Sequence, residues 1–521
     1  MAGLTAAAYV AREGRSVVLV EKNERCGGLV GTFSRNGFLF DTGIRALEDA
    51  GIIRPMLRDL GIELEFVDSP VSVGVEQEII DIESAASLET YREMLTKLYP
   101  ESEEEIRRII GVVRKVMKEM EVLYGVENPV FRNPGADPAY VLRVLIPWLP
   151  RFLFTVRRIN RMAYPVEQFL ERATRNRSLR DIIGQGFFKG TPTFFAMSYF
   201  SLYLDYIYPK PGTGALPSAL ERKVTGCGGR IVTGAEITEV VASENVARDG
   251  RGSSYHYRSL VWAADLKRLY AITGTEGLTA EETRKIVSRT REIEDRRGGD
   301  SVFVLSLTVD EPPESFARVA HGHFLYTPSR QGLGEVDRRE VRELVRNREH
   351  VSKPELLSWL DRFCRLTTYE ISIPALRNPA AAPEGKTGLV VSVLFPYDLV
   401  KKVDESGWYE EFRSEVEDRM VEVLSDSVYP MLKGSVISQF SSTPLDIERR
   451  AGSSDGAITG WSFEEPSPAV NRMQNVARSV LTPIRHVYQA GQWTYSPAGL
   501  PMSILTGKLA ADRALKECRR R

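Results

Sequence analysis

The chain has 521 residues, a length that predicts two or three domains rather than one core. Its 69 lysine and arginine residues nearly balance its 70 aspartate and glutamate residues, which argues against nucleic acid or another polyanion as a partner. The cysteines are isolated and show no metal-ligand spacing, so we expect no metal site and a reducing, cytoplasmic compartment.

The first 28 residues predict part of a dinucleotide-binding βαβ unit. Gly3 precedes a predicted helix, Leu4 to Arg12, and a strand of apolar residues, Ser16 to Val20, follows. We expect this strand to be parallel and buried, with Glu21 at its carboxyl end, where an acid can accept ribose hydroxyls. The first strand and the first two glycines of a GxGxxG turn are absent before Gly3. The cofactor-binding residues predicted here are Gly3, Glu21, Lys22, Gly27 and Gly28.

The next segment predicts a β-hairpin that turns at Asn36-Gly37. Asp41 follows as a turn or helix-cap residue rather than an acid catalyst. We expect Arg45 to begin a segment beside the cofactor, which makes it a candidate site residue. Residues 63–82 are rich in strand formers, and residues 89–125 predict a helical hairpin broken at Pro100.

The segment from Pro138 to Val166 contains no acidic residue, and arginines alternate there with large apolar side chains. Such a segment suits insertion into an anionic lipid surface, and a buried connector between helices is the alternative. Pro147 and Pro150 are expected to break any single helix. No uncharged apolar run reaches the ~20 residues that span a bilayer, so any membrane contact should be peripheral.

An aromatic-rich stretch, Phe187 to Tyr208, places Phe195, Tyr199 and Tyr203 on one helical face. This stripe is either core or part of a ligand tunnel. The chain then returns to α/β character, with predicted strands at 230–232, 237–242 and 260–264. A mixed region, 301–440, contains strands at 302–309 and 389–394.

The last 35 residues predict a strand, His486 to Ala490, a loop from Gly491 to Gly499, and a helix, Pro501 to Lys516. The loop presents backbone amides at a helix N-terminus, which favours a partly negative ring edge.

Several motifs together resemble one family of flavoenzymes. They are GLTAAAYVAREGRSVVLVEKNERCGG, GFLFDTG, YPKPGTGALPSALERKVTGCGGRIVTGAEITEVV, VWAAD and YQAGQWTYSPAGLPMSILTGKLAADRAL. In this order they are similar to the phytoene desaturase, carotenoid isomerase and retinol saturase family of FAD-dependent oxidoreductases. The resemblance covers the whole chain.

The resemblance implies an α/β fold: a Rossmann-like FAD-binding domain that lacks its first strand, with an inserted α+β substrate domain, as in flavin amine oxidases. The FAD domain would comprise residues 1–65, 209–300 and 441–521, and the substrate domain residues 66–208 and 301–440. Residues 138–166 would be its helical, membrane-facing part. Further FAD contacts carried over by the resemblance are Ile237, Gly491, Gln492, Gly499, Leu500 and Pro501.

The expected reaction is hydride transfer between flavin N5 and a carbon of an apolar polyene or isoprenoid, giving desaturation, saturation or isomerisation of a C=C bond. Arg45, His321 and His323 are the candidate proton donors or substrate anchors, and each has a structural role as its alternative. One rival function is a flavin amine oxidase or porphyrinogen-type oxidase. A rival of another class is a flavin-free, membrane-surface lipid-binding protein. We expect a cytoplasmic protein, with a peripheral position on the inner membrane face as the alternative.

The missing strand leads to one expectation about the gene. Met1 would be an internal residue just after a GxG turn, and the DNA upstream would encode the strand and that turn. The 521-residue form should then bind FAD poorly and an extended form should bind it well. A stop codon immediately upstream would contradict this.

Overall fold

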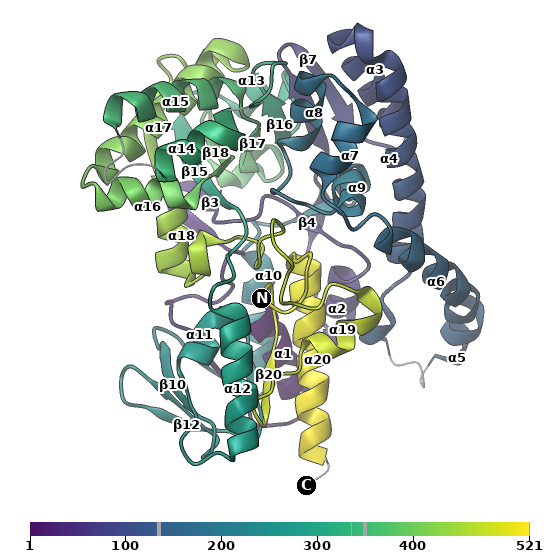
Figure 1. Cartoon of the computed structure of the whole chain (residues 1–521), viewed down its shortest axis with the longest axis vertical. Coiled ribbons are helices and arrows are strands. Elements are labelled where there is room, and N and C mark those ends of the chain that lie inside the picture. Colours follow the sequence, from purple (N-terminus) through teal and green to yellow (C-terminus); the bar gives the residue numbers. More distant parts are fainter. Residues whose placement is uncertain (133–136, 335, 347–351, 520–521) are drawn as a thin grey trace.

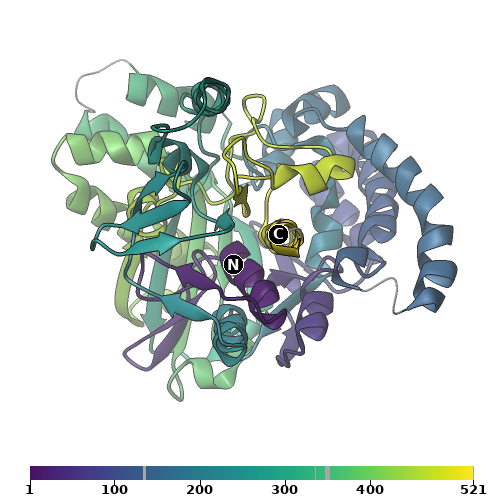
Figure 2. The same ribbon diagram turned by 90° about the horizontal axis from the view of Figure 1, so that it is seen from below.

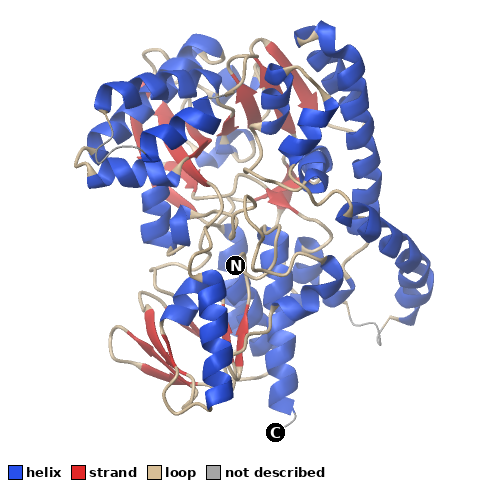
Figure 3. Cartoon of the chain, viewed as in Figure 1, coloured by secondary structure: helices blue, strands red, loops and turns tan. Residues whose placement is uncertain are grey.

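The computed structural model describes residues 1–132, 137–334, 336–346 and 352–519. One half of the molecule is built around a seven-stranded sheet, and the other around helices α1, Ala2–Arg12, and α20, Leu500–Arg519 (Figures 1 and 3). Met1 lies in the interior of the molecule, beside α20, in both the front view and the view from below (Figures 1 and 2).

The seven-stranded sheet has the order β19-β15-β18-β17-β16-β6-β7, and all neighbours are antiparallel except β16 and β6. Its strands are β6, Val71–Val75; β7, Glu78–Ile82; β15, Ser301–Val309; β16, His323–Thr327; β17, Tyr369–Ser372; β18, Thr387–Phe395; and β19, Val436–Ser442. The predicted strands at 302–309 and 389–394 are therefore confirmed.

The two faces of this sheet differ because side chains alternate along each strand. One face carries Phe303, Leu305 and Leu389, which form an apolar core with α15, Lys353–Leu366, α16, Tyr397–Glu405, and α17, Tyr409–Ser427. The pairing places His323, Glu370 and Ser392 on the opposite face. We call this second face the polar face.

A second core lies among helices beside β6 and β7. It contains α3, Ser87–Leu98; α4, Glu103–Tyr124; α7, Val166–Ala173; α8, Arg177–Gly184; and α9, Thr193–Tyr203. The helical hairpin with a break at Pro100 is confirmed, and α9 carries the predicted aromatic stripe.

Short parallel pairs surround α1 and α20. β1, Val18–Val20, pairs with β9, Arg230–Val232, and β13, Leu260–Trp262, pairs with β20, Val487–Gln489. The strands lie where the sequence predicts them, but the expectation that the first is fully buried is wrong, since Val18 is 43% exposed. Within the described part of the chain β1 has a partner on one edge alone, so its two-stranded ladder lacks the neighbours that cover a parallel sheet.

Smaller elements complete this half. The hairpin of β2, Thr32–Arg35, and β3, Phe38–Asp41, turns at Asn36 and Gly37, whose φ angles are both positive, as the Asn-Gly signal predicts. A three-stranded sheet joins β4, Leu47–Glu48, β8, Tyr206–Pro209, and β5, Phe66–Asp68. A four-stranded sheet contains β10, Ile237–Val241; β11, Val246–Asp249; β12, Ser254–His256; and β14, Thr273–Gly274. Helices α2, Ile53–Leu60, α10, Ala215–Gly226, α11, Leu266–Ala271, and α12, Ala280–Ile293, flank these sheets.

The arginine-rich segment forms one continuous helical rod, Pro138–Asn160, at the edge of the molecule (Figure 1). The expectation that its prolines break the helix is wrong. A π-helical turn, Val141–Leu145, precedes Pro147, which lies in the first turn of α6, Ile146–Asn160, where a proline needs no N–H donor; Pro150 lies inside α6.

The rod is also not a buried connector, so that alternative is wrong. Its outer apolar side chains are at least half exposed: Leu142 63%, Ile146 56%, Leu149 50%, Leu153 58% and Phe154 67%. By length and composition it is the one helix among the described residues that could cross a membrane.

The division of the chain into two discontinuous domains stays a prediction. The pairing of β1 with β9 and of β13 with β20 does bring together segments from the beginning, middle and end of the chain.

Candidate functional site

Glycines from distant segments meet at the start of α1. A Cβ on Gly3 would lie 3.3 Å from the Cβ of Ala263, so Gly3 allows close contact between α1 and the end of β13. The carbonyl of Gly27 lies 3.5 Å from the amino nitrogen of Met1. Gly491 has a φ of +101°, and its Cβ would lie 3.5 Å from the Cβ of Ala2. Three other chain segments thus meet at the N-terminus of α1, whose first backbone N–H groups have no partner within the helix.

The loop that follows β20 is held against the same place. Gly491 N donates to Thr506 Oγ1 at 3.0 Å, and Thr494 Oγ1 donates to the carbonyl of Gly491 at 2.5 Å. The loop ends at Gly499, Leu500 and Pro501, where α20 begins. Gln492 Nε2 donates to Ser453 Oγ at 3.3 Å, so its side chain is turned toward a neighbouring loop.

The acid at the end of β1 is pre-positioned. Glu21 Oε1 accepts from the backbone N and the Nδ2 of Asn23, at 2.9 and 3.1 Å, which fixes the carboxylate. Lys22 Nζ instead donates to the carbonyl of Arg449 in α18, Pro444–Ala451, at 3.1 Å. Ile237 begins β10 and packs, partly buried, against the core around Trp262.

A buried ionic network lies between this region and the polar face of the large sheet. Asp41 accepts hydrogen bonds from Tyr208 Oη at 2.8 Å and from Thr213 N at 2.9 Å. Arg45 is 3% exposed and donates to the carbonyl of Asp41 at 3.2 Å and to Ser392 Oγ at 2.8 Å. Burial lowers the pKa of the Arg45 guanidinium, and the charges of Glu370 and Asp41 oppose that effect.

His323 lies in the middle of this polar face. Its Nε2 is 3.0 Å from Glu370 Oε1, and its ring stacks on Tyr206 at 5.3 Å with an angle of 6° between the planes. Burial lowers the pKa of His323, although the hydrogen bond to Glu370 opposes this, so the imidazole is neutral at pH 7. Burial raises the pKa of Glu370, but the hydrogen bond from His323 and the charges of Arg45 and Arg377 outweigh it and hold the pKa below its usual range.

These protonation states determine the tautomer of His323. An ionised Glu370 accepts the Nε2 proton, which leaves Nδ1 as an acceptor. Nδ1 is buried and has no hydrogen-bond partner among the described residues. His321 lies elsewhere: its Nε2 is 3.7 Å from Asp81 Oδ1 and 3.5 Å from Glu83 Oε1, at the β7 edge of the sheet.

Aromatic rings continue away from His323 in a row. The aromatic row consists of Tyr206, Tyr203, Tyr199 and Phe187, with successive centroids 5.9, 5.9 and 4.9 Å apart. One side of the row packs on the helical core, yet each of its side chains is only partly buried. Burial raises the pKa of all three tyrosines, so their hydroxyls are neutral.

Glu48 stands opposite Tyr206 in the pairing of β4 with β8. Burial, reinforced by the charges of Asp205 and Asp49, raises the pKa of Glu48 to about 8. The arrangement therefore combines a helix N-terminus lined by glycines, a neutral histidine oriented by a carboxylate, and a row of aromatic rings.

The comparisons with known proteins agree with this geometry. The family model of the flavin-containing amine oxidoreductases matches residues 1–515. The chain belongs to this family. It is an FAD-dependent oxidoreductase with the α/β architecture of the flavin amine oxidases.

Among the relatives of this flavin oxidoreductase is the 4,4'-diapolycopene oxygenase of Methylomonas sp, 22% identical over 99% of this chain and 97% of that protein. Another is the all-trans-retinol 13,14-reductase of Danio rerio, 20% identical over 94% of this chain and 80% of that protein. Of the solved structures, an oxidoreductase from Methanosarcina mazei superposes with a TM-score of 0.60 at 13% identity, covering 99% of this chain and 98% of that one. Cyclohexylamine oxidase from Brevibacterium oxydans gives 0.57 at 11%, covering 99% and 97%.

The residues around α1 fit FAD. Unpaired N–H groups and the positive end of the helix dipole at α1 suit a pyrophosphate, and the α1 first turn contains no acidic side chain to repel it. Gly28 has a φ of +65°, and no atom lies within 4 Å of the place that a Cβ would take there, so space remains beside the loop. Glu21 would accept the ribose hydroxyls, and the amides from Gly499 to Pro501 would face the ring system. These assignments, including those of Lys22, Ile237 and Gln492, stay predictions.

We expect Gly28→Ala to weaken FAD binding about 10- to 100-fold, because the new methyl group would occupy the space left for the phosphates. Gly14→Ala is the matched control, since Gly14 has a φ of +67°, equally open surroundings and a position at the far end of α1. Both changes should cost about 1 kcal/mol of stability, since both place alanine at positive φ. Equal FAD dissociation constants for the two variants, measured by flavin fluorescence, would contradict the assignment.

The structure brings Arg45 and His323 together and leaves His321 apart. Sequence reasoning missed Glu370, Arg377 and Glu48. Glu370 lies within the strand Tyr369–Ser372. A charged residue in such a strand is the sequence feature that could have marked Glu370 as a candidate site residue. No local signal marks Arg377, which follows a 3₁₀ turn, as a buried cation.

Proposed function

We propose that this FAD-dependent oxidoreductase acts on a carbon-carbon bond of an apolar polyene or isoprenoid. The observation that carries the proposal is the aromatic row that ends at His323. A conjugated chain can lie along successive ring faces, which supply apolar and π contacts without hydrogen-bond requirements. The names of the two full-length relatives, a diapolycopene oxygenase and a retinol reductase, support a substrate of this kind.

The residues of the chain would do three things. The aromatic row would position the apolar chain, and the closely packed helices behind it would exclude water. His323 would accept or return a proton at Nδ1, while Glu370 holds Nε2 and keeps the ring oriented. Bound FAD supplies the hydride acceptor or donor.

The test is an anaerobic flavin titration. Reduced, FAD-loaded protein should be reoxidised by a linear C30 polyene with loss of polyene absorbance, or oxidised protein should be bleached by its more saturated precursor. The competing function, an amine oxidase, predicts hydrogen peroxide formation from putrescine or benzylamine in air. The proposal would be overturned if either amine reduced the flavin while neither the polyene nor its precursor changed the flavin spectrum.

We also propose that the protein is cytoplasmic and that the helical rod, Pro138–Asn160, docks on an anionic membrane surface, which would place the protein on the inner membrane face. The exposed leucines and Phe154 would enter the acyl region, while exposed Arg151 and Arg157 would meet lipid phosphates. The opposite side of the rod is committed to the protein: Trp148 Nε1 donates to the carbonyl of Val122 at 2.6 Å, and Arg158 pairs with Glu119 at 2.5 Å. These contacts favour a rod lying on the surface over one that crosses the bilayer.

Reversing Arg151 and Arg157 to glutamate should reduce co-sedimentation with vesicles of phosphatidylglycerol and phosphatidylcholine at least 10-fold, at about 1 kcal/mol lost per charge near the surface. The matched control is Arg284→Glu with Arg291→Glu, which makes the same change in net charge on the exposed side of α12. Arg158 is left unchanged because it already pairs with Glu119. Equal sedimentation of both double variants would exclude the docking surface.

A further inference from the structure

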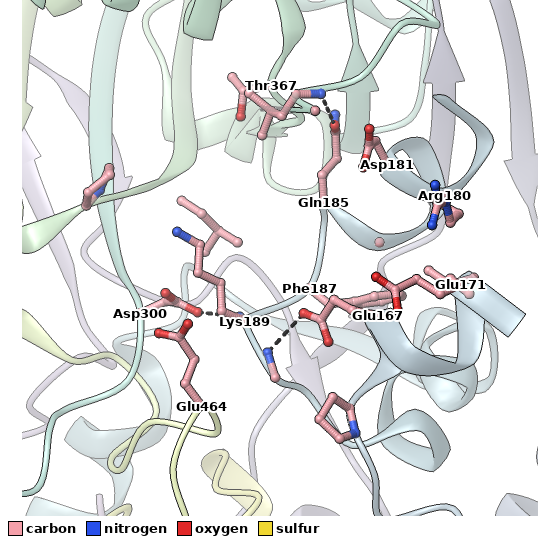
Figure 4. Close-up of a pocket in the computed structure, with 18 of the residues that line it drawn as sticks. Glu167, Glu171, Arg180, Asp181, Gln185, Phe187, Lys189, Asp300, Thr367 and Glu464 are labelled. Atoms are coloured by element: carbon pink, nitrogen blue, oxygen red, sulfur yellow. Dashed lines mark hydrogen bonds between the residues drawn. The ribbon is translucent and has the colours of Figure 1, made fainter. Parts of the chain in front are cut away.

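A pocket of about 390 Å³ opens next to the aromatic row (Figure 4). It lies between α7, α8, the loop 187–190 and the ends of β15 and β18. Its apolar lining comes from Leu170, Phe187, Leu333, Phe363, Leu394 and Phe395. The volume is within the range of small-molecule sites, and no residue assigned above to the cofactor lines it.

Two residues connect the pocket with the site already described. Phe187 lines the pocket and is also the outermost ring of the aromatic row, 4.9 Å from Tyr199. Leu394 lines the pocket two residues after Ser392, and both lie on the polar face of the sheet. A chain lying along the row would therefore have its far end in this pocket.

Glu167 provides an unused acceptor there. Its Oε1 accepts from the backbone N of Gly190 at 3.0 Å, which fixes the carboxylate. Its Oε2 is buried and has no hydrogen-bond partner among the described residues. In Figure 4 the Glu167 carboxylate points into the space toward which Lys189, Asp300 and Glu464 also extend. Polar and charged groups surround the space on several sides, and Glu167 is the one among them whose acceptor lacks a partner in the described part of the chain.

We propose that this pocket binds the hydroxyl end of an isoprenoid or polyene alcohol, whose O–H donates to Glu167 Oε2 while its chain lies on the aromatic row. The inference rests on the proposed function and specifies its substrate class. A buried acceptor without a partner costs about 1–3 kcal/mol, and a donor from the ligand recovers that cost. A hydrocarbon end leaves the oxygen unpaired, and a carboxylate end would place two negative charges in contact.

The test compares end groups on one chain. Displacement of the fluorescent polyene diphenylhexatriene from FAD-loaded protein is measured for geranylgeraniol, geranylgeranic acid and geranylgeranylamine at pH 7.5. We expect the alcohol to bind at least 10-fold more tightly than the acid. Binding rather than turnover is the readout, so it does not depend on the reaction.

Glu167→Gln makes the test sharper. The amide oxygen of glutamine can keep the hydrogen bond from the backbone N of Gly190, so the substitution replaces the acceptor Oε2 by an NH2 donor. The variant should bind the alcohol about 10-fold more weakly and the acid more tightly, an inversion that general damage to the fold would not produce. The comparison variant is Glu171→Gln, one turn further along α7, which removes the same charge from an exposed residue of the pocket rim and should leave the alcohol bound more tightly than the acid.

The outcomes separate the inference from the proposed function. Three results would each overturn the hydroxyl assignment, even where the flavin titration shows a reaction with polyenes. The wild-type protein could show no preference for the alcohol over the acid, it could bind the amine most tightly, or Glu167→Gln and Glu171→Gln could have equal effects. No displacement of diphenylhexatriene by any of the three ligands, together with no flavin reaction, would overturn both.

Discussion

Replacing Arg377 by methionine is expected to lower the free energy of unfolding by about 3–5 kcal/mol, the usual cost of removing one partner from a buried ionic network. The guanidinium is 8% exposed and donates to the carbonyl of Arg45 at 2.8 Å, to Ser69 Oγ at 3.1 Å and to Ser372 Oγ at 2.5 Å. It also stacks over the ring of Tyr208 at 4.1 Å. Methionine fills much of the volume but satisfies none of these acceptors, so the loss should appear directly in a urea denaturation curve.

Arg362→Met is the matched control for this measurement. Arg362 is 48% exposed and pairs with Glu340 at 2.6 Å, a surface contact whose loss should cost no more than about 1 kcal/mol. If the two variants lost equal stability, Arg377 would not be the link between the segment at Arg45 and the large sheet. That link is what holds Arg45 beside Ser392.

Replacing His323 by glutamine is expected to reduce kcat about 10²- to 10⁴-fold, the range over which a positioned acid or base contributes. Glutamine cannot offer the free Nδ1 acceptor or change its protonation state, although it can still donate to Glu370. Because His323 lies on the sheet rather than beside α1, the dissociation constant for FAD should stay within a factor of three. Stopped-flow measurement of the flavin half-reaction with the polyene gives the rate of the chemical step, and flavin fluorescence gives the dissociation constant for FAD.

His321→Gln serves as the control for this change, since it removes a histidine two residues away that faces Asp81 and Glu83. Its kcat should stay within about threefold of wild type. A His323 variant that retains a tenth or more of the activity would show that His323 is a structural residue and would redirect attention to Glu48, whose pKa is raised to about 8.

The two experiments address different parts of the same polar face. The hydrogen bond from His323 and the positive charges of Arg45 and Arg377 keep the Glu370 carboxylate ionised, and the ionised carboxylate in turn determines which nitrogen of His323 carries the proton. Loss of Arg377 should therefore also affect turnover, whereas loss of His323 should affect stability much less. We therefore predict that this network positions the imidazole and takes no part in the reaction itself.

Local sequence determined the elements whose residues interact with near neighbours. The Asn36-Gly37 turn, the helical break at Pro100, the strand Arg230–Val232 and the stripe of Phe195, Tyr199 and Tyr203 all depend on backbone preferences or on i, i+4 spacing. The family was also readable from the sequence, because its motifs are short and keep their order along the chain. The continuous helix through Pro147 and Pro150 was not predictable from local sequence, because the π-helical turn before Pro147 leaves no pattern in the sequence and α6 continues through Pro150.

The site residues from the middle of the chain required the tertiary structure. Arg45 is far in the sequence from Glu370 and Ser392, and it meets them because β17 and β18 pair in one register, which places their alternate side chains on the same face as His323. The burial of Arg45 and His323, and hence the tautomer of His323, depends on how many neighbours surround them in space. The sequence alone therefore determined the cofactor family and the local elements, while long-range strand pairing and burial decided which polar side chains form the candidate active site.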